Sequence, residues 1–325
     1  MRPLKTSVRK RKPFKLYPIN QSALYKLTSP GKLYHVLDSE QEEIDSILGS
    51  NENYREFTLL EDYNPFSQKV TKRRLVQTPA RKLRAIHERI LKLLQRMEHP
   101  GYAHAGVKKR SYRSNAIAHE KSKAVATFDL SNFYGQVKSF HVNKFFSTQM
   151  NCVGDVSGIL TALTTFRNCL PTGSPLSPLL ALHSSRPMYD ELNTLAEKHG
   201  LIFTCYVDDL TFSGDLIPLS LEREVKSVVR RHGHVINDKK TRIFTEKQPK
   251  HVTGTVIINN KVHVPYARIV SVRRLEAAIN GEIDRYGFSE QKLMEKLAGV
   301  LNEASYLDPK FKHKALLARN SLSLK

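Results

Sequence analysis

The clearest hydrophobic pattern in the chain surrounds single and paired aspartates. In residues 201–214, two runs of apolar, aromatic and β-branched residues flank the adjacent pair Asp208 and Asp209. This pattern predicts a strand, a tight turn and a second strand. Another apolar run, residues 124–130, carries Asp129 near its end and predicts a further strand. Because 79 residues separate Asp129 from Asp208, only a folded sheet could bring the three carboxylates together.

In two segments of the N-terminal half, apolar residues recur at the spacing of one helix face. Residues 39–48 predict a short capped helix with Ile44, Ile47 and Leu48 on its apolar face. Residues 72–76 predict a strand, and Pro79 marks a turn. A basic amphipathic helix follows, and its apolar stripe consists of Leu83, Ile86, Ile90, Leu93 and Leu94.

The C-terminal half changes from short strands to helices. Residues 176–182 predict a helix that packs under the sheet, and residues 252–262 predict a β-hairpin. After Pro265 the spacing becomes helical, with one stripe interrupted by Gly281. The two stripes are Leu275, Ile279 and Ile283, and Leu293, Leu297, Val300 and Leu301.

Composition points to a polyanionic partner. The 325 residues carry a formal net charge of +21, which favours nucleic acid or a membrane surface as the partner. No apolar run approaches the length of a membrane span, and the N-terminus lacks the apolar core of a signal peptide. The three cysteines have no metal-ligand spacing and indicate reduced thiols. We therefore expect a soluble cytoplasmic protein with no membrane partner.

The first 15 residues are strongly basic. No acidic residue precedes Asp38. The segment could be an arm that grips phosphates or a disordered solubilising tail, and basic runs occur in both roles. The basic residues are Arg2, Lys5, Arg9, Lys10, Arg11, Lys12 and Lys15.

The three aspartates suggest metal chemistry. Asp is common in solvated turns, but two adjacent carboxylates between apolar strands repel each other unless a cation lies between them. Carboxylate oxygens are preferred ligands of hard divalent cations, and two such ions can assist an in-line displacement. Asp129, Asp208 and Asp209 are therefore candidate metal ligands for nucleotidyl transfer.

Four motifs in order resemble those of reverse transcriptases. They are Phe128-Asp129-Leu130, the loop at residues 170–178, Tyr206-Val207-Asp208-Asp209, and residues 233–241. The resemblance implies an α+β right-hand polymerase, with fingers, a palm whose antiparallel sheet packs on helices, and a helical thumb. It also implies two Mg²⁺ ions, held by the three aspartates and Leu130, and deoxynucleoside triphosphates as substrates.

This resemblance also suggests a division of the chain. Residues 1–65 would form a basic extension with a short helical element, residues 66–265 the fingers and palm, and residues 266–325 the thumb. A generic helical tail is the alternative for the last segment.

Two further motifs are similar to those of retron reverse transcriptases. Asn115-Ala116-Ile117-Ala118-His119 fits the pattern Asn-Ala-x-x-His, and Val252-Thr253-Gly254 fits Val-Thr-Gly. The resemblance implies a cognate structured non-coding RNA as template, priming from a guanosine 2′-hydroxyl, and a branched RNA–DNA product, msDNA. It further implies anti-phage defence with a partner effector protein. The alternatives are a group II intron or diversity-generating type of reverse transcriptase, and a non-catalytic RNA-binding scaffold.

The family motifs also suggest nucleotide-binding residues. Arg73 or Arg74 would meet the triphosphate, with the register ambiguous by one residue. Tyr134 would exclude the ribose 2′-hydroxyl, with Phe133 as its alternative. Thr172, where many members carry Gln, and Gly173 would shape the substrate loop. Lys240 would supply charge or a proton near the pyrophosphate, unless Lys239 and Lys240 are simply a solvated pair.

Basic residues around Tyr112 predict an RNA-binding segment. Basic residues interleaved with an aromatic one suit a strand that follows a phosphate backbone. The spacing of Asn115 and His119 places them on one face of a helix, where a structural role or RNA contact is expected. The RNA-binding candidates are Lys108, Lys109, Arg110, Arg113, Asn115, His119, Val252, Thr253 and Gly254.

Overall fold

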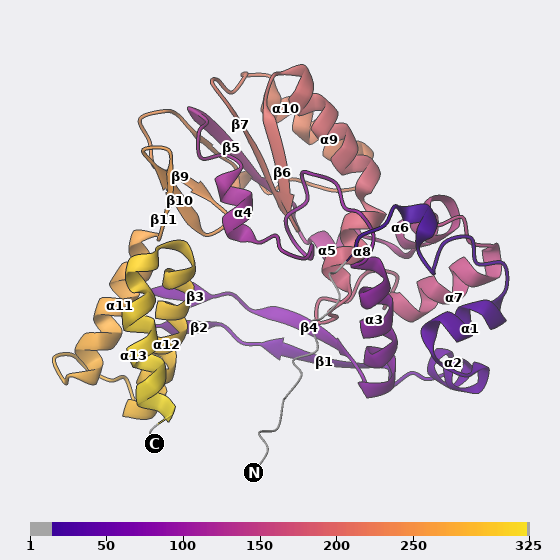
Figure 1. The fold of residues 1–325 in the computed structure, drawn as a ribbon, viewed down its shortest axis with the longest axis horizontal. Helices are drawn as coiled ribbons and strands as arrows, with labels where there is room; N and C mark the ends of the chain where they lie inside the picture. Colours follow the sequence, from indigo (N-terminus) through magenta and orange to yellow (C-terminus); the bar gives the residue numbers. More distant parts are fainter. Residues whose placement is uncertain (1–14, 324–325) are drawn as a thin grey trace, which may run out of the picture.

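A computed structural model describes residues 15–323. The N-terminal part of this range combines short helices with a long antiparallel ribbon (Figure 1). Its elements are η1 (Ile19–Gln21), α1 (Pro30–Leu37), α2 (Gln41–Leu48), β1 (Tyr54–Leu59), β2 (Asp62–Asn64), β3 (Lys69–Thr71), β4 (Arg74–Pro79), α3 (Arg81–Leu94) and α4 (Tyr112–Ile117). The predicted helix with the basic amphipathic pattern is α3, and all five of its stripe residues are buried. Of the basic N-terminal segment, only Lys15 lies within the described residues.

The middle of the chain forms the central sheet and the helices that pack on it. The element bounds are β5 (Ala124–Asp129), α5 (Phe133–Gln136), α6 (Ser139–Lys144), η2 (Phe145–Gln149), α7 (Gly154–Thr164), α8 (Ser177–Ser184), α9 (Arg186–Lys198), β6 (Ile202–Tyr206), β7 (Asp209–Gly214), α10 (Leu221–Arg231), η3 (Asp238–Lys240) and β8 (Arg242–Phe244). The four strands are antiparallel and lie in the order β6-β7-β5-β8. Helices and antiparallel sheets together make this an α+β protein.

Alternation of side chains gives the central sheet two different faces. Phe128, Phe203 and Phe212 lie in the main hydrophobic core, with ring centroids 5.8 Å apart for Phe128 and Phe212 and 4.9 Å for Phe203 and Phe212. Thr127 and Thr211 are direct cross-strand partners on the opposite, polar face. The apolar face is fixed by burial, which leaves the polar face available for chemistry.

The C-terminal part contains a three-stranded meander followed by helices. Its elements are β9 (Lys250–Val252), β10 (Thr255–Ile258), β11 (Lys261–His263), α11 (Tyr266–Ile279), α12 (Glu290–Leu307), η4 (Pro309–Phe311) and α13 (Lys312–Ser323). The predicted hairpin is present as β10 and β11, but Thr253 and Gly254 form a separate turn between β9 and β10. The stripe prediction for Ile283 is wrong, because α11 ends at Ile279 and Ile283 is exposed.

The ribbon reaches across the molecule and meets the C-terminal helices (Figure 1). Strands β1 and β4 pair near the body, while β2 and β3 extend the ribbon to its tip, residues 64–69. Phe66 at this tip is only 2% exposed and belongs to the same hydrophobic cluster as Val272, Leu275 and Leu293. Burying one such side chain contributes about 1.5–3 kcal/mol. The ribbon is therefore anchored at both ends.

Candidate active site

Asp129 and Asp209 lie directly opposite each other on neighbouring strands. Asp129 is the last residue of β5 and pairs with Asp209, the first residue of β7. Direct cross-strand partners on an antiparallel sheet point to the same face, with Cβ atoms about 4.5–5.5 Å apart. Asp208 lies in the adjacent turn, and its carbonyl oxygen accepts a hydrogen bond from the Leu130 amide at 2.9 Å. The fold thus gathers all three predicted carboxylates.

The turn between β6 and β7 holds a strained residue. Tyr206 pairs with Asp209, so Val207 and Asp208 form a two-residue turn, and Val207 has a φ of +58°. A β-branched residue rarely adopts this left-handed conformation. The buried Tyr189 hydroxyl donates a hydrogen bond to the Val207 carbonyl oxygen at 2.9 Å. We infer that packing around the turn maintains this conformation and thereby aims the aspartates.

Lys240 neutralises one of the three carboxylates. Its Nζ atom lies 2.5 Å from Oδ1 of Asp129, which excludes the simple solvated-pair interpretation for this lysine. Burial, with the neighbouring charges of Asp208 and Asp129, raises the pKa of Asp209 to about 7. Burial also raises the pKa of Asp208. Both carboxylates would therefore gain from an additional cation.

The loop predicted to shape the substrate site is pinned to strand β4. The Thr172 hydroxyl accepts from the Gln77 amide at 3.2 Å and donates to the Leu75 carbonyl at 3.0 Å. The Gly173 amide donates to the Gln77 carbonyl at 3.0 Å. A Cβ atom on Gly173 would lie 2.7 Å from that carbonyl oxygen, so the close approach requires glycine. Thr172 therefore supports the loop through backbone contacts, a role its hydroxyl can fill without an amide.

The two arginines of the ribbon differ in their relation to the aspartates. Arg74 begins β4, and its positive charge lowers the pKa of Asp208 against the larger effect of burial. Arg73 lies outside the strand, and both arginines are exposed. This electrostatic coupling favours Arg74 as the residue nearer to the aspartates.

The two aromatic residues after Asp129, Phe133 and Tyr134, also differ in their relation to the aspartates. Phe133 is 4% exposed and packs in the core, with its ring 5.4 Å from that of His234. Tyr134 is only partly buried, and the nearby charge of Asp208 adds to burial in raising its pKa. Tyr134 therefore lies close enough to Asp208 to sense its charge, while Phe133 belongs to the core.

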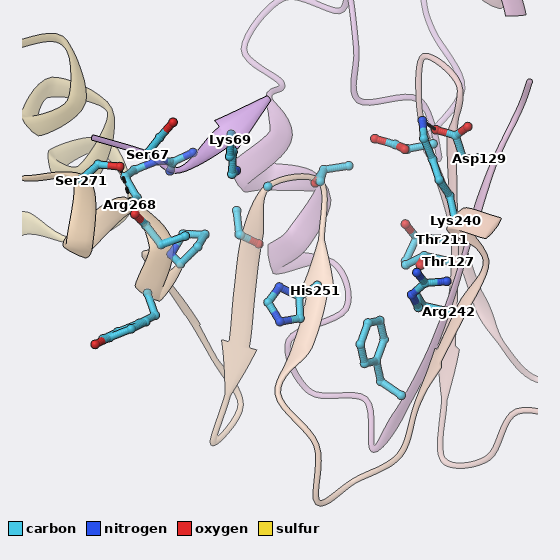
Figure 2. A pocket seen from close by; sticks show the side chains of 18 of the residues that line it. Ser67, Lys69, Thr127, Asp129, Thr211, Lys240, Arg242, His251, Arg268 and Ser271 are labelled. Carbon is cyan, nitrogen blue, oxygen red and sulfur yellow. Dashed lines mark hydrogen bonds and ion pairs between the residues drawn. The ribbon is translucent and has the colours of Figure 1, made fainter. Parts of the chain in front are cut away.

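Asp129 and Asp209 line a cleft of about 690 Å³ (Figure 2). One wall carries Asp129 and Lys240 from the sheet region. The opposite wall carries Ser67 and Lys69 from the ribbon tip, together with Arg268 of α11. These opposite-wall residues were missed by the sequence analysis, because only folding brings the ribbon tip to α11.

The two motifs Asn-Ala-x-x-His and Val-Thr-Gly contact each other. The Asn115 amide donates to the Thr253 hydroxyl at 3.3 Å, and Thr253 donates to the Tyr112 carbonyl at 3.2 Å. Asn115 and Val252 are completely buried, whereas Gly254 is exposed. The side chains of Asn115 and Val252 therefore present no surface to an RNA.

His119 is also completely buried, beneath the polar face of the central sheet. Its Nδ1 atom lies 2.6 Å from the Ser213 hydroxyl, and its Nε2 atom lies 2.7 Å from the Thr204 hydroxyl. These bonds connect the segment just after α4 to both strands of the β6–β7 hairpin. Burial lowers the pKa of His119 to about 3, so the ring is neutral at physiological pH. Of the two expected roles, the structural one fits, and direct RNA contact by this side chain is contradicted.

The predicted basic strand around Tyr112 is wrong. Residues 112–117 form α4, and the preceding residues form a loop. The Arg110 guanidinium donates to the carbonyls of Pro100, Gly101 and Ala103, so it organises the loop. Arg113 lies over the Tyr306 ring of α12, 5.7 Å from its centroid. Lys108 and Lys109 are exposed.

Comparison with known proteins identifies the family. The family profile described as reverse transcriptase (RNA-dependent DNA polymerase) matches residues 66–257. The retron Se72 reverse transcriptase of Salmonella heidelberg (strain 579083-10) is 31% identical over 233 residues, which cover 68% of this chain and 59% of that protein. The retron Ec86 reverse transcriptase of Escherichia coli is 30% identical over 208 residues, which cover 62% of this chain and 63% of that protein. The retron Mx162 reverse transcriptase of Myxococcus xanthus is 27% identical over 279 residues, which cover 76% of this chain and 57% of that protein.

The chain belongs to the reverse transcriptase family and, within it, to the retron type. Its matching segments span about six tenths of the length of these relatives. Among residues 15–323, no helix combines the length and apolar character needed to cross a membrane.

Proposed function

We propose that the protein is an RNA-directed DNA polymerase that copies a template RNA by metal-assisted nucleotidyl transfer. The observation that supports this most strongly is the cross-strand pairing of Asp129 with Asp209, beside Asp208 in the turn. Family membership gives this cluster its chemistry. On this proposal, the central sheet is the palm and α11–α13 are the thumb. The fingers include the whole ribbon β1–β4, so they begin at Tyr54 and not at residue 66, because β1 pairs with β4 and β2 with β3.

The carboxylates are of the ligand type that divalent cations prefer. Asp129, Asp208 and Asp209 offer hard oxygen ligands, and the backbone carbonyl of Leu130, the residue after Asp129, could add another. Within residues 15–323, no three acidic, histidine or cysteine side chains already converge as a metal site. A bound cation would draw the carboxylates closer together and would compete with Lys240 for Asp129. Two Mg²⁺ ions, when bound, would polarise the attacking hydroxyl and offset charge on the leaving pyrophosphate.

The surrounding side chains have distinct proposed tasks. Arg74 binds the triphosphate of the incoming deoxynucleotide, and Lys240, once released from Asp129, meets the pyrophosphate. The Tyr134 ring blocks an added ribose hydroxyl. Thr172 and Gly173 hold the substrate loop against β4, as their hydrogen bonds to Leu75 and Gln77 indicate.

The retron relatives support a more specific template. We include a cognate structured RNA, self-priming and a branched msDNA product in the proposal, because the relatives are named retron reverse transcriptases. The exposed Lys108, Lys109 and Gly254 and the partly exposed Arg113 and Thr253 are the remaining candidates from the predicted RNA-binding set. An effector partner and a role in anti-phage defence stay predictions from the retron resemblance.

Two measurements test this proposal. The purified protein should extend a DNA primer annealed to a generic RNA when supplied with deoxynucleotides and Mg²⁺, and chelation with EDTA should stop extension. Sequencing the nucleic acid that co-purifies with the protein should show RNA joined to its complementary DNA. Absence of extension would contradict the polymerase, whereas extension without a branched product would contradict only the retron-specific part.

A further inference from the structure

The ribbon tip packs against α11 and the segment that follows it, and two recesses lie at this contact. Arg274 donates to the Pro65 carbonyl at 3.2 Å. With its amide oriented to satisfy these hydrogen bonds, the Gln68 side-chain oxygen accepts from both terminal nitrogens of Arg274 at 2.7 and 2.8 Å. The Tyr286 ring meets Phe66 edge-on, with centroids 5.8 Å apart. The active-site cleft lies on one side of this contact, where Ser67 and Lys69 face Arg268 (Figure 2).

A second recess of about 540 Å³ lies at the same contact, and we call it the outer groove. Val270 and Ala277 of α11 contribute apolar surface to it. Its polar and aromatic residues come from the ribbon and from the C-terminal helical region. They are Tyr63, Gln68, Tyr266, Arg273, Arg274 and Tyr286.

The tyrosines of the outer groove are unusually exposed. Tyr63 is 55% exposed, Tyr266 is 72% exposed and Tyr286 is 54% exposed. Tyrosine rings normally bury much of their area, so three exposed rings around one recess suggest a surface that contacts a planar ligand. Tyr286 is held by its packing on Phe66, which fixes one ring before any ligand arrives.

The charges of the groove favour a polyanion. Arg273 is exposed, and Arg274 keeps its guanidinium at the contact with the ribbon tip. The neighbouring Asp284 directs Oδ1 to the Tyr286 amide at 2.7 Å, and Arg285 donates to the carbonyls of Ala278 and Ile279. The outward positive charge of the groove therefore comes from Arg273 and Arg274.

Exposed aromatic rings beside arginines match the chemistry of single-stranded nucleic acid binding. Bases stack on aromatic rings and on guanidinium planes, while arginine also binds phosphate. Tyr266 lines both the cleft and the outer groove, so one strand could run from one recess to the other. A duplex cannot use such a recess in this way, because its bases are already stacked inside the helix.

We propose that the outer groove binds an unpaired segment of the RNA that the protein copies, outside the catalytic cleft. This inference rests on the proposed function, since it assigns the segment to the same RNA. Tyr63 and Tyr286 stack on its bases, and Arg273 contacts its phosphates. The groove thus distinguishes a template that carries an unpaired flank from a fully paired one.

Fluorescence anisotropy with two matched substrates tests the groove. Both contain the same RNA–DNA duplex, and one carries unpaired RNA tails at both ends. The wild-type protein should bind the tailed substrate more tightly than the fully paired one. The double variant Tyr63→Ala with Arg273→Ala should lower the ratio of these two affinities by about tenfold. Both side chains are exposed, so folding should be retained.

Three controls make the result decisive. Arg223→Ala removes an exposed arginine from α10, on the central-sheet side of the molecule, and should retain the tail preference (Figure 1). Tyr63→Phe keeps the ring and should retain it as well. Equal loss of affinity for tailed and fully paired substrates in the double variant would overturn the proposal, as would an unchanged tail preference. Because binding needs no catalysis, primer extension along the unpaired RNA of the tailed substrate separately tests the polymerase assignment.

Discussion

Single residues acquire distinct roles through their place on a strand or helix. The sequence offers Arg73 or Arg74, and Phe133 or Tyr134, as alternatives that differ by one position. Strand β4 begins at Arg74, and the short helix α5 turns Phe133 into the core. A one-residue shift reverses which side chain faces a site, and no pattern in these short elements sets that register in advance.

Tyr134 provides a prediction at this scale. Tyr134→Val should increase incorporation of ribonucleotides relative to deoxynucleotides by about tenfold or more, because the smaller side chain leaves room for the 2′-hydroxyl. Single-nucleotide extension with each triphosphate measures the ratio. The matched variant Phe133→Val should chiefly lower stability. Relaxed sugar selection by Phe133→Val, with Tyr134→Val unchanged, would show that the assignment is reversed.

At the scale of elements, long periodic segments were predictable and short ones were not. The stripe of α3 predicted its buried face correctly, because fourteen residues give several repeats of the helical period. Residues 112–117 are too few for such a signal, and their basic and aromatic composition suggested a strand. Folding then placed Asn115 under the turn at Thr253, a contact between segments 138 residues apart. Aspartates at strand ends were predictable, but the facing ribbon tip was not.

The buried network of His119 yields the second prediction. His119→Ala leaves the hydroxyls of Thr204 and Ser213 without their histidine partner, so unfolding free energy should fall by about 1–3 kcal/mol. Urea denaturation measures this change. Primer extension on generic RNA and self-primed synthesis on the cognate RNA should decline together. Unchanged stability with selective loss of self-primed synthesis would instead support a role in RNA recognition.

The ribbon tip yields the third prediction. Phe66→Ala removes the side chain that anchors the ribbon in the C-terminal helices, so hydrogen exchange of residues 64–69 should accelerate. Val70→Ala is the matched control, because Val70 lies nearby on the ribbon and is 53% exposed. If both variants exchange like the wild-type protein, the Phe66 contact does not hold the ribbon in place.

At the scale of the whole molecule, buried histidines connect stability to pH. Burial lowers the pKa of His87 and His234 to about 4, and that of His119 and His183 to about 3. The unfolded chain therefore binds more protons than the folded protein between about pH 3 and pH 6.5. The stabilising contribution of these neutral rings is complete above pH 6.5 and is lost as the pH falls.

This linkage gives the fourth prediction. The free energy of unfolding, measured with urea at pH 7.5, 6 and 5, should decrease steeply below about pH 6.5. His87→Gln should flatten the decrease, because it removes one of the groups that titrate. A free energy that is constant from pH 7.5 to pH 5 would show that these histidines are protonated without cost in the folded protein.

Single-turnover primer extension on RNA with Mg²⁺ tests most directly whether the three carboxylates are required for DNA synthesis. Asp208→Asn with Asp209→Asn should slow extension by more than about 100-fold, because the metals lose anionic ligands, while circular dichroism and RNA affinity stay unchanged. Asp215→Asn, which alters an exposed carboxylate just beyond β7, should leave the rate unchanged. Extension by the double variant at the wild-type rate would contradict the account.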